Sequence, residues 1–142
     1  MHELNQALLV LHFLGLAMGL AVPLANMVLM TIVSRATPDE RAVLARFPPR
    51  MVRVGDTGLV LLWATGLTLV FTKWGGFAIL PWQFHVKLTA VVLLTLTIGY
   101  VHALMGKAKR GDAAAAARMP AVGRVALLFA LTAVVFAVLT FN

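Results

Sequence analysis

Cysteine is absent from this chain of 142 residues, and only 12% of its residues are charged. The absence of cysteine excludes disulfide bonds and thiolate ligands, so any metal site must use other donors. The scarcity of charge excludes an ordinary soluble domain, because 61% of the residues are hydrophobic and a soluble domain of this length does not need so much apolar surface. We therefore expect an integral membrane protein whose main partner is the lipid bilayer.

Acidic residues are scarce as well: 5 Asp and Glu stand against 12 Lys and Arg, which gives a net charge of +7. In a soluble chain such an excess of positive charge would indicate a nucleic-acid partner. Here the basic residues lie between apolar runs and have almost no aromatic residues among them. We expect no nucleic-acid binding, and we assign the positive charge a role in membrane topology.

Four apolar runs approach or exceed the ~20 residues that cross ~30 Å of hydrocarbon as a helix. The runs are residues 8–33, 55–71, 84–105 and 122–141. The predicted fold is all-α, a four-helix transmembrane bundle that forms a single domain over residues 1–142. Residues 37–40, Thr-Pro-Asp-Glu, have the pattern of a helix start and predict a short interfacial helix at about 38–47. Because so short a chain has a thin core, we also expect a homodimer.

The basic residues lie mainly on one side of the predicted membrane. Ten of them fill or flank the loops after the first and third runs: Arg35, Arg41, Arg46, Arg50, Arg53, Lys107, Lys109, Arg110, Arg118 and Arg124. The opposite side has Lys73 and Lys87. The positive-inside rule then places both basic loops in the cytoplasm and both termini on the outer, periplasmic side. We expect a multi-pass protein of the bacterial inner membrane.

Ionisable side chains inside a membrane span are costly, and they are therefore candidates for function. His12, in the outer half of the first run, is a candidate metal ligand or proton relay. Gly15 and Gly19 share its helical stripe and leave a shallow surface beside the imidazole, which admits either a neighbouring helix or a flat cofactor. At a similar depth, His85 begins the third run as a candidate ligand or an interfacial residue, with Lys87 extending to the interface beside it.

Two histidines that face each other across a bundle are the arrangement needed for axial ligation of a b-type haem. Such a haem would be noncovalent, because the chain has no cysteine for its attachment. We prefer His85 to Lys87 as the partner of His12, since imidazole is neutral when it binds a metal. The predicted metal ligands are therefore His12 and His85, and the predicted cofactor-binding residues also include Lys87, Gly15 and Gly19.

A second polar layer is expected toward the cytoplasmic ends of the runs, where Asn26, Asp56 and His102 lie at similar depths. His102 follows His85 by 17 residues, or roughly 26 Å of helix, so these two histidines cannot bind one ion. Asp56 forms either an ion pair with Arg53 or a proton-transfer pair with His102, which is otherwise an interfacial residue. We assign Asp56, His102 and Arg53 a catalytic role in proton handling.

Copper is the alternative cofactor. Thioether sulfur is a soft donor, and Met18, Met27 and Met30 follow His12 in the first run. Methionine in a helix equally serves packing, so the three sulfurs leave both interpretations open.

Three short motifs resemble the HemJ-type protoporphyrinogen oxidases. They are Leu11-His12-Phe13 with Gly19-Leu20 and Pro23, then Trp63-Ala64-Thr65-Gly66-Leu67, and then Trp82-x-x-His85-Val86-Lys87-Leu88. The motifs occur in the order of the family's spans, and the resemblance covers nearly the whole chain. A more distant resemblance connects the chain to CopD-like membrane proteins.

The resemblance implies a small four-helix membrane protein that binds haem b and oxidises protoporphyrinogen IX, with electrons passing to the membrane quinone or respiratory pool. It implies that His12 is a haem ligand and that Lys87 or His85 is its partner. We accordingly expect a b-type haem protein that acts in electron transfer or in oxidation of a porphyrinogen-like substrate. The alternatives are a copper-handling membrane protein and a non-catalytic accessory membrane subunit.

Overall fold

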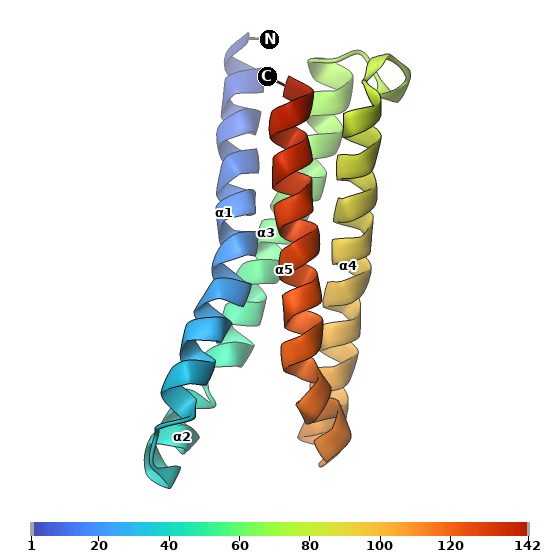
Figure 1. Cartoon of the computed structure of the whole chain (residues 1–142). Coiled ribbons are helices and arrows are strands. Elements are labelled where there is room, and N and C mark those ends of the chain that lie inside the picture. Colours follow the sequence, from blue (N-terminus) through green and yellow to red (C-terminus); the bar gives the residue numbers. More distant parts are fainter. Residues whose placement is uncertain (1, 142) are drawn as a thin grey trace. The chain divides into compact units, whose positions relative to one another are not determined.

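The computed structural model describes residues 2–141, and over this range the regular structure is entirely helical. The elements are α1 (His2–Val33), α2 (Pro38–Leu44), α3 (Phe47–Thr72), a 3₁₀ turn (Phe77–Ile79), α4 (Trp82–Lys109) and α5 (Ala113–Phe141) (Figure 1). Within the described range α1, α3, α4 and α5 are each long and apolar enough to cross a membrane. The prediction of an all-α chain with four long apolar helices is confirmed, and each predicted run lies within one of them.

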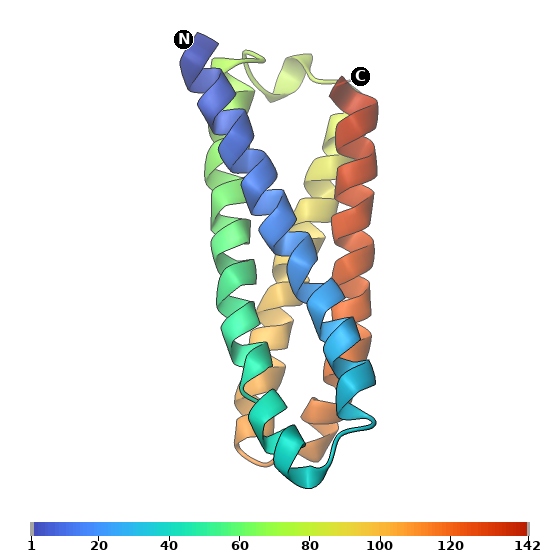
Figure 2. The same cartoon turned by 90° about the vertical axis from the view of Figure 1, so that its left-hand side faces the viewer.

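The contacts between residues divide the chain into two compact units. The N-terminal unit ends at Ile79 and contains α1, α2 and α3, whereas the C-terminal unit begins at Leu80 and contains α4 and α5. In each unit two long helices lie side by side and antiparallel, as a hairpin (Figures 1 and 2). Each candidate residue is therefore described relative to the helices of the hairpin that contains it.

In the N-terminal unit, α1 and α3 meet along a seam of constant register. Asn5 pairs with Thr72 and His12 pairs with Thr65, one heptad further along each helix. The next heptad step brings Gly19 to Gly58. Each of the first two pairs is joined by a hydrogen bond between side chains at 2.9 Å. Polar side chains at heptad spacing thus connect the first half of α1 to the second half of α3.

Glycine brings the two backbones together at the middle of the seam. A Cβ atom added to Gly58 would lie 2.7 Å from the carbonyl oxygen of Gly15, and a Cβ added to Gly15 would lie 2.8 Å from the carbonyl oxygen of Gly58. Both distances are too short for a real Cβ, and the obstructing atoms belong to the backbone. Small residues are the usual means of such close approach between membrane helices.

Beyond the glycines, α1 turns away from α3. Pro23 lies inside α1 and has no N–H to donate to the carbonyl of Gly19, which weakens the helix at this point. Figure 1 shows the bend in α1, and Figure 2 shows α1 and α3 spreading apart toward α2. Asn26 would form the next polar step of the seam, but it follows the bend, and its Oδ1 atom is buried with no hydrogen-bond partner among the described residues.

The short helix α2 begins where the sequence indicated. Thr37 is its N-cap: the Thr37 hydroxyl accepts a hydrogen bond from the Glu40 N–H, and the Glu40 carboxylate accepts one from the Thr37 N–H at 2.8 Å. The helix ends at Leu44 rather than near residue 47. Phe47 is already the first residue of α3, because the two prolines that follow it have no N–H and fit best in the first turn of a helix.

Removal of the N-cap hydroxyl should loosen α2. We expect Thr37→Ala to raise the amide hydrogen exchange rates of α2 by about fivefold, the usual cost of a lost cap. Thr37→Ser is the matched control, since it keeps the hydroxyl and should keep the wild-type rates. Equal protection of α2 in the Thr37→Ala protein would show that packing, and not the cap, holds this helix.

In the C-terminal unit, a tight turn joins α4 to α5. Gly111 has a positive φ of 92°, and its N–H and that of Arg110 bond back to carbonyls in the last turn of α4. Asp112 then caps α5 by accepting a hydrogen bond from the Ala115 N–H at 3.0 Å. The alanine-rich segment after Asp112 is therefore the first turn of a long helix. At the other end of the hairpin the rings of Trp82 and Phe136 meet edge to face.

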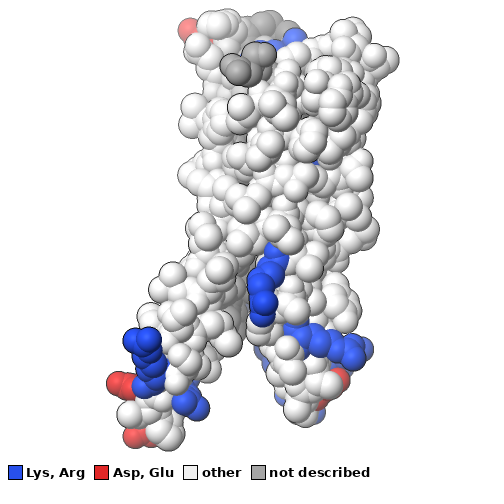
Figure 3. Space-filling view, viewed as in Figure 1, with Lys and Arg blue, Asp and Glu red and all other residues white. Residues whose placement is uncertain are grey.

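Charged side chains gather at one end of each hairpin. In the N-terminal unit this end comprises α2 and the adjoining ends of α1 and α3, and in the C-terminal unit it is the turn between α4 and α5. Figure 3 shows these charged ends and the mainly uncharged surface of the helices beyond them. Each hairpin by itself has the charge distribution of two membrane spans with a basic connecting loop.

Candidate functional site

His12 is the predicted site residue with the most specific surroundings. It lies half-buried on the seam between α1 and α3, and its Nδ1 atom is 2.9 Å from the Thr65 hydroxyl oxygen. Thr65 is only 4% exposed, and its hydroxyl also contacts the Leu61 carbonyl oxygen at 2.5 Å. The imidazole is therefore connected to the backbone of α3 through one buried side chain.

The ring of His12 also has a fitted place against α3. A Cβ added to Gly66 would lie 3.2 Å from Cε1 and 3.7 Å from Nδ1 of His12. Any larger residue at position 66 would press on the edge of the imidazole that faces Thr65. The Thr65-Gly66 pair thus supplies both a hydrogen-bonding group and the space that the ring occupies.

The two glycines on the His12 stripe differ in their surroundings. Gly15 is buried, and its close approach to Gly58 makes it a packing residue of the α1–α3 seam. A Cβ added to Gly19 would meet no atom within 4 Å in the described part of the chain. Of the two positions, only Gly19 leaves space beside α1.

His85 and Lys87 are placed differently on α4. His85 is exposed and its ring lies beside that of Phe84, with centroids 5.9 Å apart, whereas Lys87 is half-buried. At about 100° per residue, Lys87 points roughly 60° from the mean direction of three buried residues of α4, and His85 points about 140° from it. These three are Ala90, Leu94 and Leu104, and the fourth buried residue of α4, Phe84, points about 120° from their mean direction.

The predicted proton-handling residues do not share the seam with His12. Asp56 is half-buried and Arg53 is exposed, one helical turn apart on α3. Asp56 points about 160° from Gly58, by the helical count, and so lies on the side of α3 opposite to α1. His102 is exposed on α4, in the other unit. Within the N-terminal unit, the seam and the Asp56 side of α3 are therefore separate surfaces.

The candidate copper donors belong to two environments. Met18 packs in the seam, where its Cβ would lie 2.9 Å from a Cβ added to Gly58. Met27 and Met30 are 51% and 52% exposed, on the surface of α1. Over residues 2–141, no three His, Asp or Glu side chains come close enough together to hold a metal ion. The described residues thus contain no ready-made metal site of that kind.

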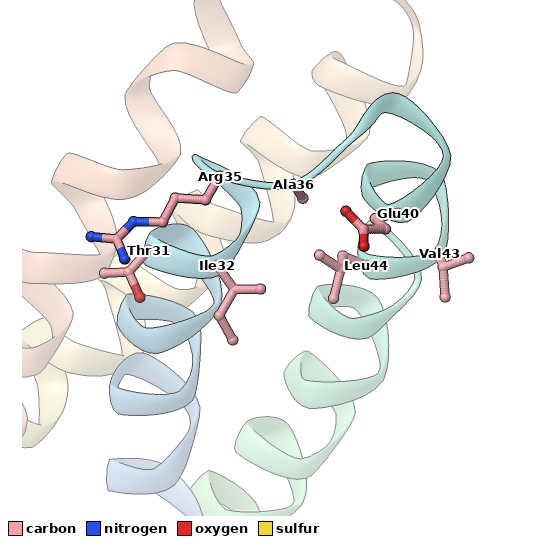
Figure 4. A pocket seen from close by; sticks show the side chains of 7 residues that line it. All are labelled: Thr31, Ile32, Arg35, Ala36, Glu40, Val43 and Leu44. Atoms are coloured by element: carbon pink, nitrogen blue, oxygen red, sulfur yellow. The ribbon is translucent and has the colours of Figure 1, made fainter.

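A hollow of about 700 Å³ opens between the end of α1 and α2 (Figure 4). Its described lining residues are Thr31, Ile32, Arg35, Ala36, Glu40, Val43 and Leu44. Ile32 and Leu44 point toward each other across it, and the Arg35 side chain extends away from α2. The lining includes neither His12 nor another predicted site residue, so the hollow is a separate feature at the charged end of the N-terminal unit.

The role of Thr65 could have been predicted from the spacing of polar residues in the sequence, although not from the residue type alone. Threonine in an apolar run resembles the other threonines of α3, such as Thr68, whose hydroxyl bonds only to the backbone carbonyl of Ala64. The seven-residue spacing distinguishes Thr65 and Thr72 from the other threonines of α3, because Asn5 and His12 on α1 have the same spacing. Matching the two heptad patterns in antiparallel order would have identified both pairs.

No protein-family model, no curated protein and no solved structure matches this chain.

Proposed function

We propose that this protein is a membrane-embedded b-type haem protein in which His12 is one axial ligand. The observation that supports the proposal is the hydrogen bond between the His12 Nδ1 atom and buried Thr65. Histidines that bind metals almost always use their second ring nitrogen in such a bond, which fixes the ring for ligation. The donor chemistry of the site therefore fits a haem.

Haem, when bound, supplies one-electron redox chemistry, and the protein sets its orientation and potential. His12 would hold the iron, and the open position at Gly19 would leave room for part of the macrocycle next to α1. Asp56, Arg53 and His102 would handle protons toward the cytoplasmic side. The proposed activity is electron transfer or oxidation of a porphyrinogen-like substrate, with a membrane quinone or respiratory carrier as the electron acceptor and a homodimer as the working form.

The second axial ligand is proposed to come from the start of α4. Neutral imidazole chemistry favours His85, whereas the partial burial of the side chain favours Lys87. Either residue fits the resemblance to the HemJ-type oxidases.

Haem and metal content distinguish this proposal from its rivals. The protein is purified in detergent from haem-sufficient cells, and haem, iron and copper are quantified for each polypeptide before and after haem is added. We expect haem near one per polypeptide after reconstitution and copper far below that ratio. Stoichiometric copper that is lost with Met27→Leu and Met30→Leu would support the copper-handling alternative. A protein that holds neither group would support the accessory-subunit alternative.

The proposed orientation has both termini on the periplasmic side and both basic loops in the cytoplasm, in a bacterial inner membrane. The native chain has no cysteine, so a single introduced cysteine reports its own side of the membrane. Ala78→Cys, in the link between α3 and α4, should react with an impermeant maleimide in intact spheroplasts. Ala114→Cys, in the first turn of α5, should react only after permeabilisation. The reverse pattern would overturn the orientation.

A further inference from the structure

The Thr65 hydroxyl has a single proton, and the geometry determines where that proton lies. Its oxygen is 2.5 Å from the Leu61 carbonyl oxygen and 2.9 Å from His12 Nδ1. Two oxygens at 2.5 Å repel each other unless a proton lies between them, and the carbonyl has none to give. The hydroxyl therefore donates to Leu61 and accepts from His12.

We infer that Thr65 is a positioning residue that holds His12 in the tautomer with the proton on Nδ1, so that the lone pair of the imidazole lies on Nε2. Nε2 is then the nitrogen that binds iron or takes up a proton. The tautomer itself follows from the α1–α3 seam alone, and its use in haem ligation rests on the function proposed above. A neutral imidazole with its donor nitrogen occupied is the form in which histidine ligates a metal.

The surroundings of His12 and Thr65 hold the two side chains in this arrangement. Thr65 is buried on α3, so its hydroxyl is shielded from competing water. The His12 ring packs closely against Gly66, since a Cβ there would lie 3.2 Å from Cε1. The close backbone approach of Gly15 and Gly58, three residues from His12 on α1 and one heptad from Thr65 on α3, fixes the distance between the helices. Rotation of the imidazole away from Thr65 would leave a buried hydroxyl oxygen without its donor.

The tautomer can be measured in the full-length protein without haem. The protein is labelled with ¹⁵N-histidine and studied by NMR in detergent at a pH where the imidazole is neutral, and the His12 signals are assigned by their loss in His12→Ala. We expect the Nδ1–H form in the wild type. Thr65→Val, which removes the hydroxyl at nearly constant shape, should lower the ratio of the Nδ1–H to the Nε2–H form by about threefold to twentyfold. Thr65→Ser should restore it.

The control variant is Thr68→Val, one turn further along α3, whose hydroxyl donates to the Ala64 carbonyl and to no other described residue. It should leave the His12 tautomer unchanged. An Nε2–H form in the wild type would overturn the inference without any variant, and so would an unchanged ratio in a folded Thr65→Val protein. If Thr65→Val does not fold, the wild-type spectrum and the Thr65→Ser protein still decide.

A second readout separates this inference from the proposed function. In reconstituted protein, Thr65→Val should shift the haem midpoint potential and the low-spin EPR signal, and Thr65→Ser should bring both back toward wild type. A haem-free protein with the Nδ1–H tautomer would contradict the proposed function and leave the inference intact. A haem protein with His12 protonated on Nε2 would contradict the inference instead.

Discussion

Replacing Gly58 with alanine lowers the free energy of unfolding of the N-terminal hairpin by about 1–3 kcal/mol, the usual cost of overpacking. The added Cβ would lie 2.7 Å from the Gly15 carbonyl oxygen and 2.9 Å from the Met18 Cβ, so α1 and α3 must separate. Gly15→Ala should have a similar effect, because its Cβ meets the Gly58 carbonyl oxygen at 2.8 Å. Denaturant titration in detergent, followed by tryptophan fluorescence, measures the change.

Gly19→Ala is the matched control for these two variants. It makes the same substitution on the same seam, and its Cβ would meet no described atom within 4 Å. Alanine is a better helix former than glycine by up to about 1 kcal/mol, so this variant should be as stable as the wild type or slightly more stable. A Gly58→Ala protein as stable as Gly19→Ala would show that α1 and α3 do not approach each other as described.

Loss of the His12 imidazole should have the largest effect on cofactor binding. We expect His12→Ala to lower the haem affinity of the reconstituted protein by more than about tenfold, since ligand loss costs at least as much as the loss of a supporting hydrogen bond. His102→Ala should bind haem as the wild type does, because this histidine is roughly 26 Å along α4 from His85. Haem titration followed by absorption measures both affinities.

Substitutions on α4 test whether this helix supplies the proposed second ligand. One of the two variants, His85→Ala or Lys87→Ala, should convert a six-coordinate low-spin spectrum into a five-coordinate or high-spin one, and the other should not. The partial burial of Lys87 and the exposure of His85 favour Lys87, and the neutral charge of imidazole favours His85. Spectra unchanged in both variants would exclude α4 as the source of the ligand and leave His12 as the only proposed ligand.

The helices could be predicted from the sequence because a lipid environment leaves few alternatives. A membrane span must satisfy its own backbone hydrogen bonds, so a long apolar run becomes a helix whatever it packs against. The start of α2 could also be predicted, because the capping interaction that defines it joins Thr37 and Glu40, which are only three residues apart. The prediction of its end near residue 47 was wrong, because the helix ends at Leu44 and the two prolines after Phe47 lie in the first turn of α3.

The site was harder to predict because it depends on pairing between distant residues. The sequence indicates His12 because an ionisable side chain inside a membrane span is energetically costly. Its partner Thr65 is 53 residues away in the sequence, and threonine is common in apolar helices. Gly15 and Gly19 looked equivalent on one helical stripe. They differ only because Gly58 lies opposite Gly15, which requires knowledge of the register between α1 and α3.

The most direct test of haem binding is the absorption spectrum of the wild-type protein, oxidised and then reduced, after purification in detergent. We predict a Soret band that sharpens and shifts on reduction, with the narrow visible bands of a six-coordinate b-type haem. A colourless protein that remains colourless after haem is added would contradict the proposed function.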